Sequence, residues 1–132
     1  MNRNEFAATI AADPNLSEPI ARAGQAARPG QQFSMVAEAA AVALMFPIVQ
    51  YIVVQIGLPW LYELKRYSEL QRQKVHQWID ERSRAEGLDP DAAEAASDAL
   101  CRELEQTTTA SARESWQRLA DLLKAGEDED NA

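Results

Sequence analysis

The apolar stretch at positions 46–62, FPIVQYIVVQIGLPWLY, is the feature that most constrains how this chain can fold. It belongs to a longer run, residues 39–62, that contains no charged side chain, whereas the rest of the sequence is polar, acidic and rich in alanine. As one helix this run would be about 36 Å long, and the hydrocarbon core of a bilayer is about 30 Å thick. The run therefore suits either a bilayer or a protein interior.

The end of this run favours the bilayer. Trp60 and Tyr62 stand where an interfacial aromatic belt would lie, and Lys65 and Arg66 follow at once. Basic residues mark the cytoplasmic side of a span. The sequence therefore predicts a membrane-associated protein whose C-terminal half is cytoplasmic, with a wholly cytoplasmic protein as the alternative.

Two prolines and two glutamines argue against insertion. Pro47 and Pro59 interrupt helical hydrogen bonding, and Gln50 and Gln55 lie about 140° apart on a helical wheel, so one α-helical face cannot hide both amides. A helix buried in a protein core explains the glutamines more easily. A β-strand over Ile48–Ile56 is a further alternative, because this segment is dense in β-branched residues.

Start and stop signals after the apolar stretch predict an all-α fold. An amphipathic pattern follows Tyr62 and ends at Gly87. Asp89 is a good N-cap and Pro90 fits the first position of the next helix. Ser111 and Glu114 have the spacing of a capping box for a last helix. The short turn at Gly87 predicts that the flanking helices fold back antiparallel, as a helical hairpin or small bundle.

These patterns divide the chain into three parts. Residues 1–33, punctuated by DP, EP and RPG, predict a flexible N-terminal arm with short helical pieces. Residues 34–125 form a helical domain, in which a long central helix at about 32–86 bends at the two prolines of the apolar stretch. An antiparallel helical segment follows at about 90–124. Residues 126–132, GEDEDNA, predict a solvated acidic tail.

The charge distribution narrows the range of partners. The net charge is −8, and most acidic residues lie after position 85. Bases and acids alternate through residues 63–84, so no strongly basic surface is expected there. Since affinity for nucleic acid depends on neutralising phosphates, the sequence argues against DNA or RNA binding.

The residues that carry chemistry are sparse. His76 is the only histidine and Cys101 the only cysteine, so a second imidazole for a metal and an intrachain disulfide are both excluded. We interpret His76 as a histidine on a helix surface and Cys101 as a small buried residue. The glycines are too scattered for a phosphate loop. We therefore expect no enzymatic activity, no catalytic, metal or cofactor site and no small-molecule substrate.

The expected function is that of an interaction protein, with a protein partner or self-association. In the favoured interpretation residues 39–62 anchor the chain in a membrane and the acidic hairpin of residues 63–124 docks a cytoplasmic partner. One alternative is a soluble helical homo-oligomer or complex subunit with 42–62 as its interface; another is a small pore-forming effector. The membrane or interface residues would be Phe46, Pro47, Gln50, Ile52, Gln55, Pro59 and Trp60. The partner-binding residues would be Trp78, Leu100, Leu104 and Trp116.

Overall fold

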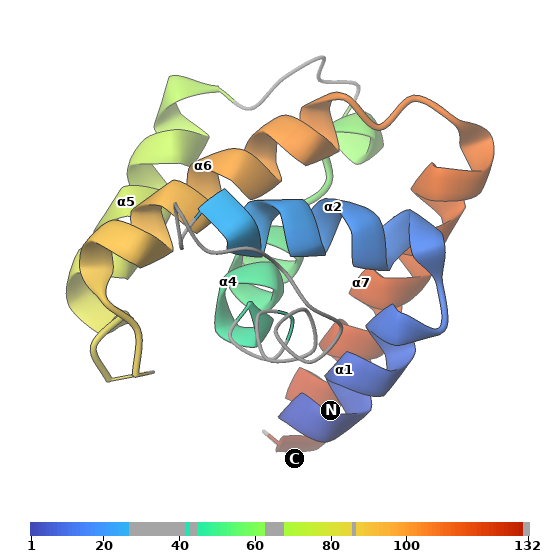
Figure 1. Ribbon diagram of the computed structural model, residues 1–132, viewed down its shortest axis with the longest axis horizontal. Helices are drawn as coiled ribbons and strands as arrows, with labels where there is room; N and C mark the ends of the chain where they lie inside the picture. Colours follow the sequence, from blue (N-terminus) through green and yellow to red (C-terminus); the bar gives the residue numbers. More distant parts are fainter. Residues whose placement is uncertain (27–41, 43–44, 63–67, 86, 131–132) are drawn as a thin grey trace.

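The chain folds into helices alone over the part that the computed structural model describes, which is residues 1–26, 42, 45–62, 68–85 and 87–130 (Figure 1). This confirms the all-α prediction for those residues. The alternative prediction of a β-strand over Ile48–Ile56 is wrong, because that segment is helical. The elements are α1 (Arg3–Ala11), α2 (Pro14–Ala26), α4 (Phe46–Gln50), a π-helix (Tyr51–Ile56), a 3₁₀-helix (Pro59–Tyr62), α5 (Glu69–Arg82), α6 (Pro90–Glu105) and α7 (Ala110–Asp130).

Side-chain caps fix the starts of α5 and α6. Ser68 and Gln71 form a reciprocal capping box at α5, in which the Gln71 N–H donates to Ser68 Oγ at 3.2 Å and the Ser68 N–H donates to Gln71 Oε1 at 2.8 Å. At α6 the Ala92 N–H donates to Asp89 Oδ2 at 3.0 Å, and Pro90 occupies the first turn. Each cap satisfies an amide that the helix itself leaves without a partner.

The last helix begins earlier than the sequence suggested. The Ala112 N–H donates to Thr109 Oγ1 at 3.2 Å, and α7 starts at Ala110, so Ser111 lies inside the helix instead of capping it. The helix also continues to Asp130, so the backbone of the predicted acidic tail is helical up to that residue.

The N-terminal residues belong to the core, which corrects the expectation of a flexible arm. Phe6 and Ile10 of α1 and Leu16 and Ile20 of α2 are buried, and α2 packs mainly against α6. Figure 1 shows the two ends of the chain close together beside α1 and α7. A Cβ atom at Gly126 would lie 2.6 Å from the Met1 backbone nitrogen, so the close approach of these ends requires glycine there. Residues 27–33 of the predicted arm lie outside the described residues.

A single bent helix from about 32 to 86 is not what the structure shows. Pro47 stands in the first turn of α4, where the missing N–H costs nothing, so it starts a helix instead of bending one. Gly57 ends the π-helix with φ 97°, a conformation that favours glycine. Ser68 then caps a new helix. The parts of the predicted helix at 32–41, 43–44, 63–67 and 86 lie outside the described residues.

The apolar stretch lies in the protein core, and the prediction of a membrane-spanning helix is wrong. In the described part of the chain, no helix combines the length and the apolar character that crossing a bilayer requires. Ile48, Val49, Ile52 and Val53 are at most 2 % exposed. Several helices provide the apolar surface that covers them. Helix α6 contacts α4, and α7 contacts the π-helix. Helix α2 in turn packs on both α6 and α7. The proposed membrane orientation and pore lose their basis with the span.

Candidate functional site

The part of the apolar stretch that remains accessible borders a cavity of about 420 Å³. This volume falls in the usual range of ligand-binding pockets. We call it the Tyr51–Trp78 cavity. Its walls come from α1, from α4 with the π-helix, and from α5. The lining residues are Arg3, Phe46, Pro47, Gln50, Tyr51, Gln55, Trp78 and Arg82.

An aromatic stack joins two of these walls. The rings of Tyr51 and Trp78 lie 4.9 Å apart between centroids and are nearly parallel, at 14°. The Tyr51 hydroxyl also donates a hydrogen bond to the Lys74 carbonyl oxygen at 3.3 Å. Burial, followed by the charge of Glu81, raises the pKa of Tyr51, so the phenol stays protonated and remains a donor. The two contacts hold α5 against the π-helix.

The π-helix places both glutamines at the same cavity. Its hydrogen bonds join residues five apart, as in the bond from the Gly57 N–H to the Ile52 carbonyl oxygen at 2.8 Å. Because a π-helical turn takes more residues than the 3.6 of an α-helix, Gln50 and Gln55, which are five residues apart, come much closer to the same side. In an α-helix they would diverge by about 140°. Short π-helical segments occur frequently at functional sites.

Two arginines line the cavity in a chain of net charge −8. Arg3 enters from α1 and Arg82 from the last turn of α5. Arg3 is engaged in a contact, whereas the guanidinium of Arg82 has no hydrogen-bond or ion-pair partner within the described part of the chain. The cavity therefore combines aromatic surface, amide groups and an unpaired cation.

The structure brings four of the seven expected interface residues to this cavity: Phe46, Pro47, Gln50 and Gln55. The other three lie elsewhere. Ile52 is fully buried in the core and Pro59 is also buried. Trp60 is half-buried, with the guanidinium carbon of Arg113 5.4 Å from its ring centroid.

Only one of the four expected partner-binding residues is accessible. Trp78 lines the cavity, but Leu100, Leu104 and Trp116 are fully buried in the core. Other helices of the same chain cover these three side chains, with α2 packed on both α6 and α7, so this fold does not present them at its surface. Leu100 and Leu104 share one face of α6 and Trp116 lies on α7; the spacing marks these faces as apolar, but the sequence does not say what covers them.

Three cavity residues were not predicted from the sequence: Arg3, Tyr51 and Arg82. Arg82 follows Trp78 by four residues and so lies on the same helix face, which is a local signal that could have linked the two. Tyr51 stands between the two glutamines. Arg3 carries no such signal, since α1 reaches the cavity only through the tertiary fold.

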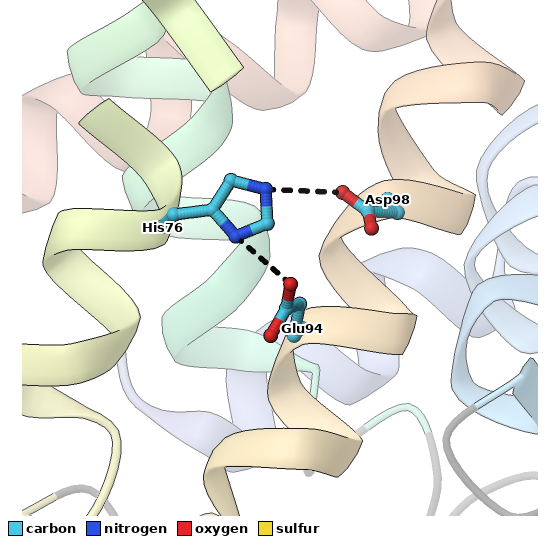
Figure 2. Close-up of side chains that lie close together, drawn as sticks. All are labelled: His76, Glu94 and Asp98. Atoms are coloured by element: carbon cyan, nitrogen blue, oxygen red, sulfur yellow. Dashed lines mark ion pairs between the residues drawn. The ribbon is translucent and has the colours of Figure 1, made fainter. Parts of the chain in front are cut away.

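A second cluster lies between α5 and α6, away from the residues that line the cavity. His76 Nδ1 lies 3.2 Å from Glu94 Oε1, and His76 Nε2 lies 3.8 Å from Asp98 Oδ1 (Figure 2). Glu94 and Asp98 are four residues apart and so share one face of α6. One ligand atom from each of the three residues lies within 4.8 Å of the others, and within the described residues this is the group that could hold a metal ion.

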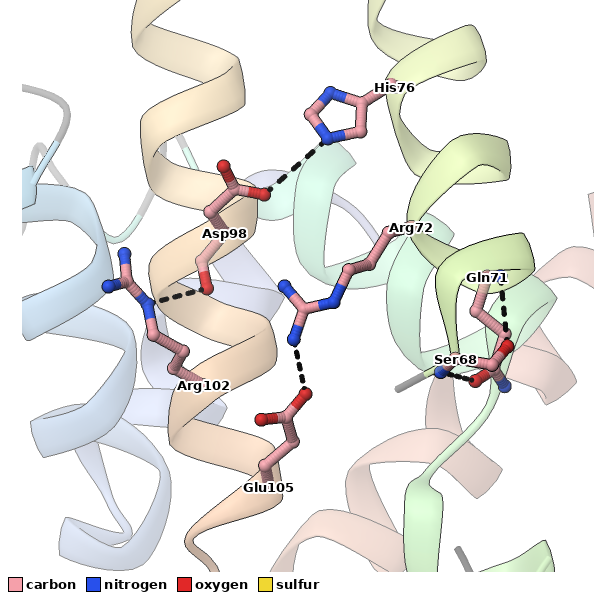
Figure 3. A network of polar contacts seen from close by, with 7 residues as sticks. All are labelled: Ser68, Gln71, Arg72, His76, Asp98, Arg102 and Glu105. Atoms are coloured by element: carbon pink, nitrogen blue, oxygen red, sulfur yellow. Dashed lines mark hydrogen bonds and ion pairs between the residues drawn. The ribbon is translucent and has the colours of Figure 1, made fainter. Parts of the chain in front are cut away.

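The same face of the two helices carries a further ion pair. Arg72, one turn before His76, donates from Nη2 to Glu105 Oε1 at 2.7 Å (Figure 3). The start of α5 therefore meets the end of α6, while His76 meets the middle of α6. The chain reverses between the two helices at Gly87, whose φ of 78° favours glycine.

Cys101 lies close to this face, but its thiol has low reactivity. It is buried, and burial raises the pKa of its thiol to about 12. The thiolate is the reactive form of cysteine, and an ordinary thiol has a pKa of about 8.5. The thiol of Cys101 is therefore almost wholly protonated at neutral pH.

We expect Cys101 of the folded protein to react with iodoacetamide at pH 8 at least about 100-fold more slowly than a free thiol, because the raised pKa and burial act together. The rate can be measured by intact-mass spectrometry. The same chain in guanidinium chloride is the control and should be modified at the ordinary rate. Equally rapid modification in both conditions would show that the thiol is accessible in the folded state.

Comparisons with protein-family models, with curated proteins and with solved structures find no match for this chain.

Proposed function

We propose that this chain is a non-enzymatic helical interaction protein that binds a protein partner at the Tyr51–Trp78 cavity. The observation that supports this most directly is the composition of the cavity, in which stacked aromatic rings lie beside the unpaired guanidinium of Arg82. Tryptophan, tyrosine and arginine are the residues that most often dominate interface energies.

The cavity chemistry defines the partner's binding group. Phe46, Tyr51 and Trp78 provide apolar surface for an aromatic or aliphatic side chain. Arg82 favours a carboxylate next to it, and Gln50 and Gln55 offer amides at the rim. We infer that the partner presents an acidic residue, or a C-terminal carboxylate, beside a large apolar side chain. A guanidinium can hold a carboxylate through two parallel hydrogen bonds.

The partner is a different chain in this proposal. Self-association was expected because an exposed apolar stretch at 42–62 would be unfavourable in water. Within one copy, however, Ile48, Val49, Ile52 and Val53 are already buried. A second copy would also bring together two chains of net charge −8.

Helices α5 and α6 serve as a supporting hairpin. The ion pair between Arg72 and Glu105 and the contacts of His76 fix α5 along α6, and the stack on Tyr51 fixes it to the π-helix. Trp78 is thereby held in place before a partner arrives. A preformed site loses less conformational entropy on binding than a mobile one.

The chemistry of the described residues supports binding over catalysis. Cys101 is buried and protonated, and His76 faces two carboxylates. A catalytic nucleophile is commonly activated by an adjacent base, and the ring nitrogens of His76 face carboxylates and not a hydroxyl or thiol within the described residues.

The proposal is tested by selecting a displayed library of short peptides for binding to the full chain. The affinity of the enriched peptides is then measured by fluorescence polarisation. We expect enrichment of sequences with a carboxylate beside an aromatic or aliphatic residue. Arg82→Glu should weaken their binding at least about tenfold, because it places like charges together. Trp78→Ala should weaken it similarly by removing the aromatic wall.

Arg84→Glu is the matched control. Arg84 is exposed, lies two residues from Arg82 and does not line the cavity, while its reversal changes the net charge by the same amount. Peptides that bind Arg82→Glu and Arg84→Glu equally well would rule out the cavity as the binding site, as would a failure of any acidic peptide to be enriched.

A further inference from the structure

His76 has a carboxylate at each of its two ring nitrogens. Glu94 Oε1 lies 3.2 Å from Nδ1 and Asp98 Oδ1 lies 3.8 Å from Nε2 (Figure 2). A neutral imidazole carries one N–H, so it can donate to one of these carboxylates only. The other nitrogen then presents a lone pair to a carboxylate oxygen, and two acceptors face each other. Either a proton or a metal cation at that nitrogen makes the arrangement favourable.

Neighbouring basic residues do not supply that cation. Arg72, one turn before His76, directs its guanidinium to Glu105, at 2.7 Å. Arg102, one turn after Asp98, directs Nε to the Asp98 backbone oxygen at 3.4 Å and not to its carboxylate (Figure 3). The two carboxylates of the cluster therefore keep their negative charge available to a bound ion.

We propose that His76, Glu94 and Asp98 bind a divalent first-row transition-metal ion such as Zn²⁺. Zinc accepts a donor set of one imidazole nitrogen and two carboxylate oxygens. The two carboxylates carry a charge of −2, which neutralises the +2 charge of the ion. With bonds of about 2.0–2.2 Å, neighbouring zinc ligands lie about 3.4 Å apart. The present separations, all within 4.8 Å, need only small side-chain rotations to reach that value.

The exposure of the three side chains allows those rotations and the entry of the ion. They are 40 %, 51 % and 39 % exposed for His76, Glu94 and Asp98 respectively. Water completes the coordination, because three protein ligands leave at least one position open. The bound ion links α5 to α6 across their shared face.

This site is separate from the proposed partner-binding cavity. None of its three residues lines the cavity, so each proposal can fail without the other. A magnesium or calcium site fits less well, since those ions prefer oxygen ligands throughout.

The test is titration of the metal-free full chain with ZnCl₂ at pH 7.5, followed by isothermal titration calorimetry and by the imidazole signals in ¹H–¹⁵N NMR spectra. Because the chain has a single histidine, its imidazole signals report on one residue. We expect one zinc ion per chain and a shift of those signals. His76→Gln and Asp98→Asn should each weaken binding at least about tenfold, and MgCl₂ should leave the imidazole signals unchanged.

Glu114→Gln is the matched control, since Glu114 is exposed on α7 and takes no part in the cluster. It should bind zinc like the unmodified chain. Imidazole signals that do not respond to zinc would overturn the proposal, because the carboxylates would then pair with a protonated histidine only. Equal zinc binding by His76→Gln and the unmodified chain would overturn it as well, since the ion would lie on other acidic groups.

Discussion

Replacing Trp116 with alanine is expected to lower the free energy of unfolding by about 3–5 kcal/mol. Trp116 is the largest of the fully buried side chains and lies on the face of α7 that also carries Leu119, Ala120 and Leu123. Removing the indole creates a cavity that close-packed neighbours can fill only in part. Since small domains are stable by only about 5–15 kcal/mol, this loss is a large part of the total.

Urea unfolding followed by circular dichroism at 222 nm measures this loss. Gln117→Ala is the control, because Gln117 is the next residue on the same helix and is exposed; its effect should stay within about 0.5 kcal/mol. Trp116→Phe should be milder than Trp116→Ala, since phenylalanine refills most of the space and removes an indole N–H that has no partner among the described residues. Similar losses for Trp116→Ala and Gln117→Ala would show that the indole contributes little packing.

Features that depend on a few neighbouring residues were predictable from the sequence. Asp89 and Pro90 begin α6 as expected, because capping joins a side chain to an amide three residues away. The break before α5 carried the same kind of signal, in the capping box of Ser68 and Gln71. The apolar pattern that continues across residues 60–79 favoured one helix and outweighed that signal.

The location of the apolar stretch depended on residues that lie far away in the sequence. Phe6 and Ile10 belong to a region whose prolines suggested an arm, yet they lie in the same core as Ile52. Pro14 and Pro19 both lie inside α2, the first in its opening turn. Pro14 fits that position, but a proline in a helix interior removes a hydrogen bond, so Pro19 argued against a packed helix here, and the packing of α2 on α6 outweighs its cost.

The candidate sites were harder to predict than the fold for a geometric reason. Gln50 and Gln55 share the cavity only because the backbone between them is π-helical, and helical periodicity of 3.6 residues places them apart. His76 lacks a second histidine or cysteine nearby in sequence. Its contacts with Glu94 and Asp98 follow from the register of α5 on α6, which no local pattern specifies.

Replacing Ile52 with aspartate is expected to have the largest effect of any single change in the apolar stretch, lowering the free energy of unfolding by more than about 4 kcal/mol or preventing folding. Ile52 is fully buried in the π-helix, among core residues from α1, α2, α6 and α7. Its position offers no cation to an introduced carboxylate within the described core. A buried carboxylate must then lose its hydration or take up a proton, and both are costly.

Gln55→Asp is the matched control, because Gln55 belongs to the same π-helix but is exposed, and its effect should stay near about 0.5 kcal/mol. Ile52→Ala provides a graded variant that keeps the experiment informative if Ile52→Asp does not fold, with an expected loss of about 2–5 kcal/mol. Urea unfolding measures all three variants. The decisive quantity is the difference between the losses of unfolding free energy caused by aspartate at positions 52 and 55. In a protein core, position 52 faces inward and position 55 faces water, whereas a lipid environment would penalise aspartate at both. Equal losses at the two positions would contradict the burial of this stretch inside the protein.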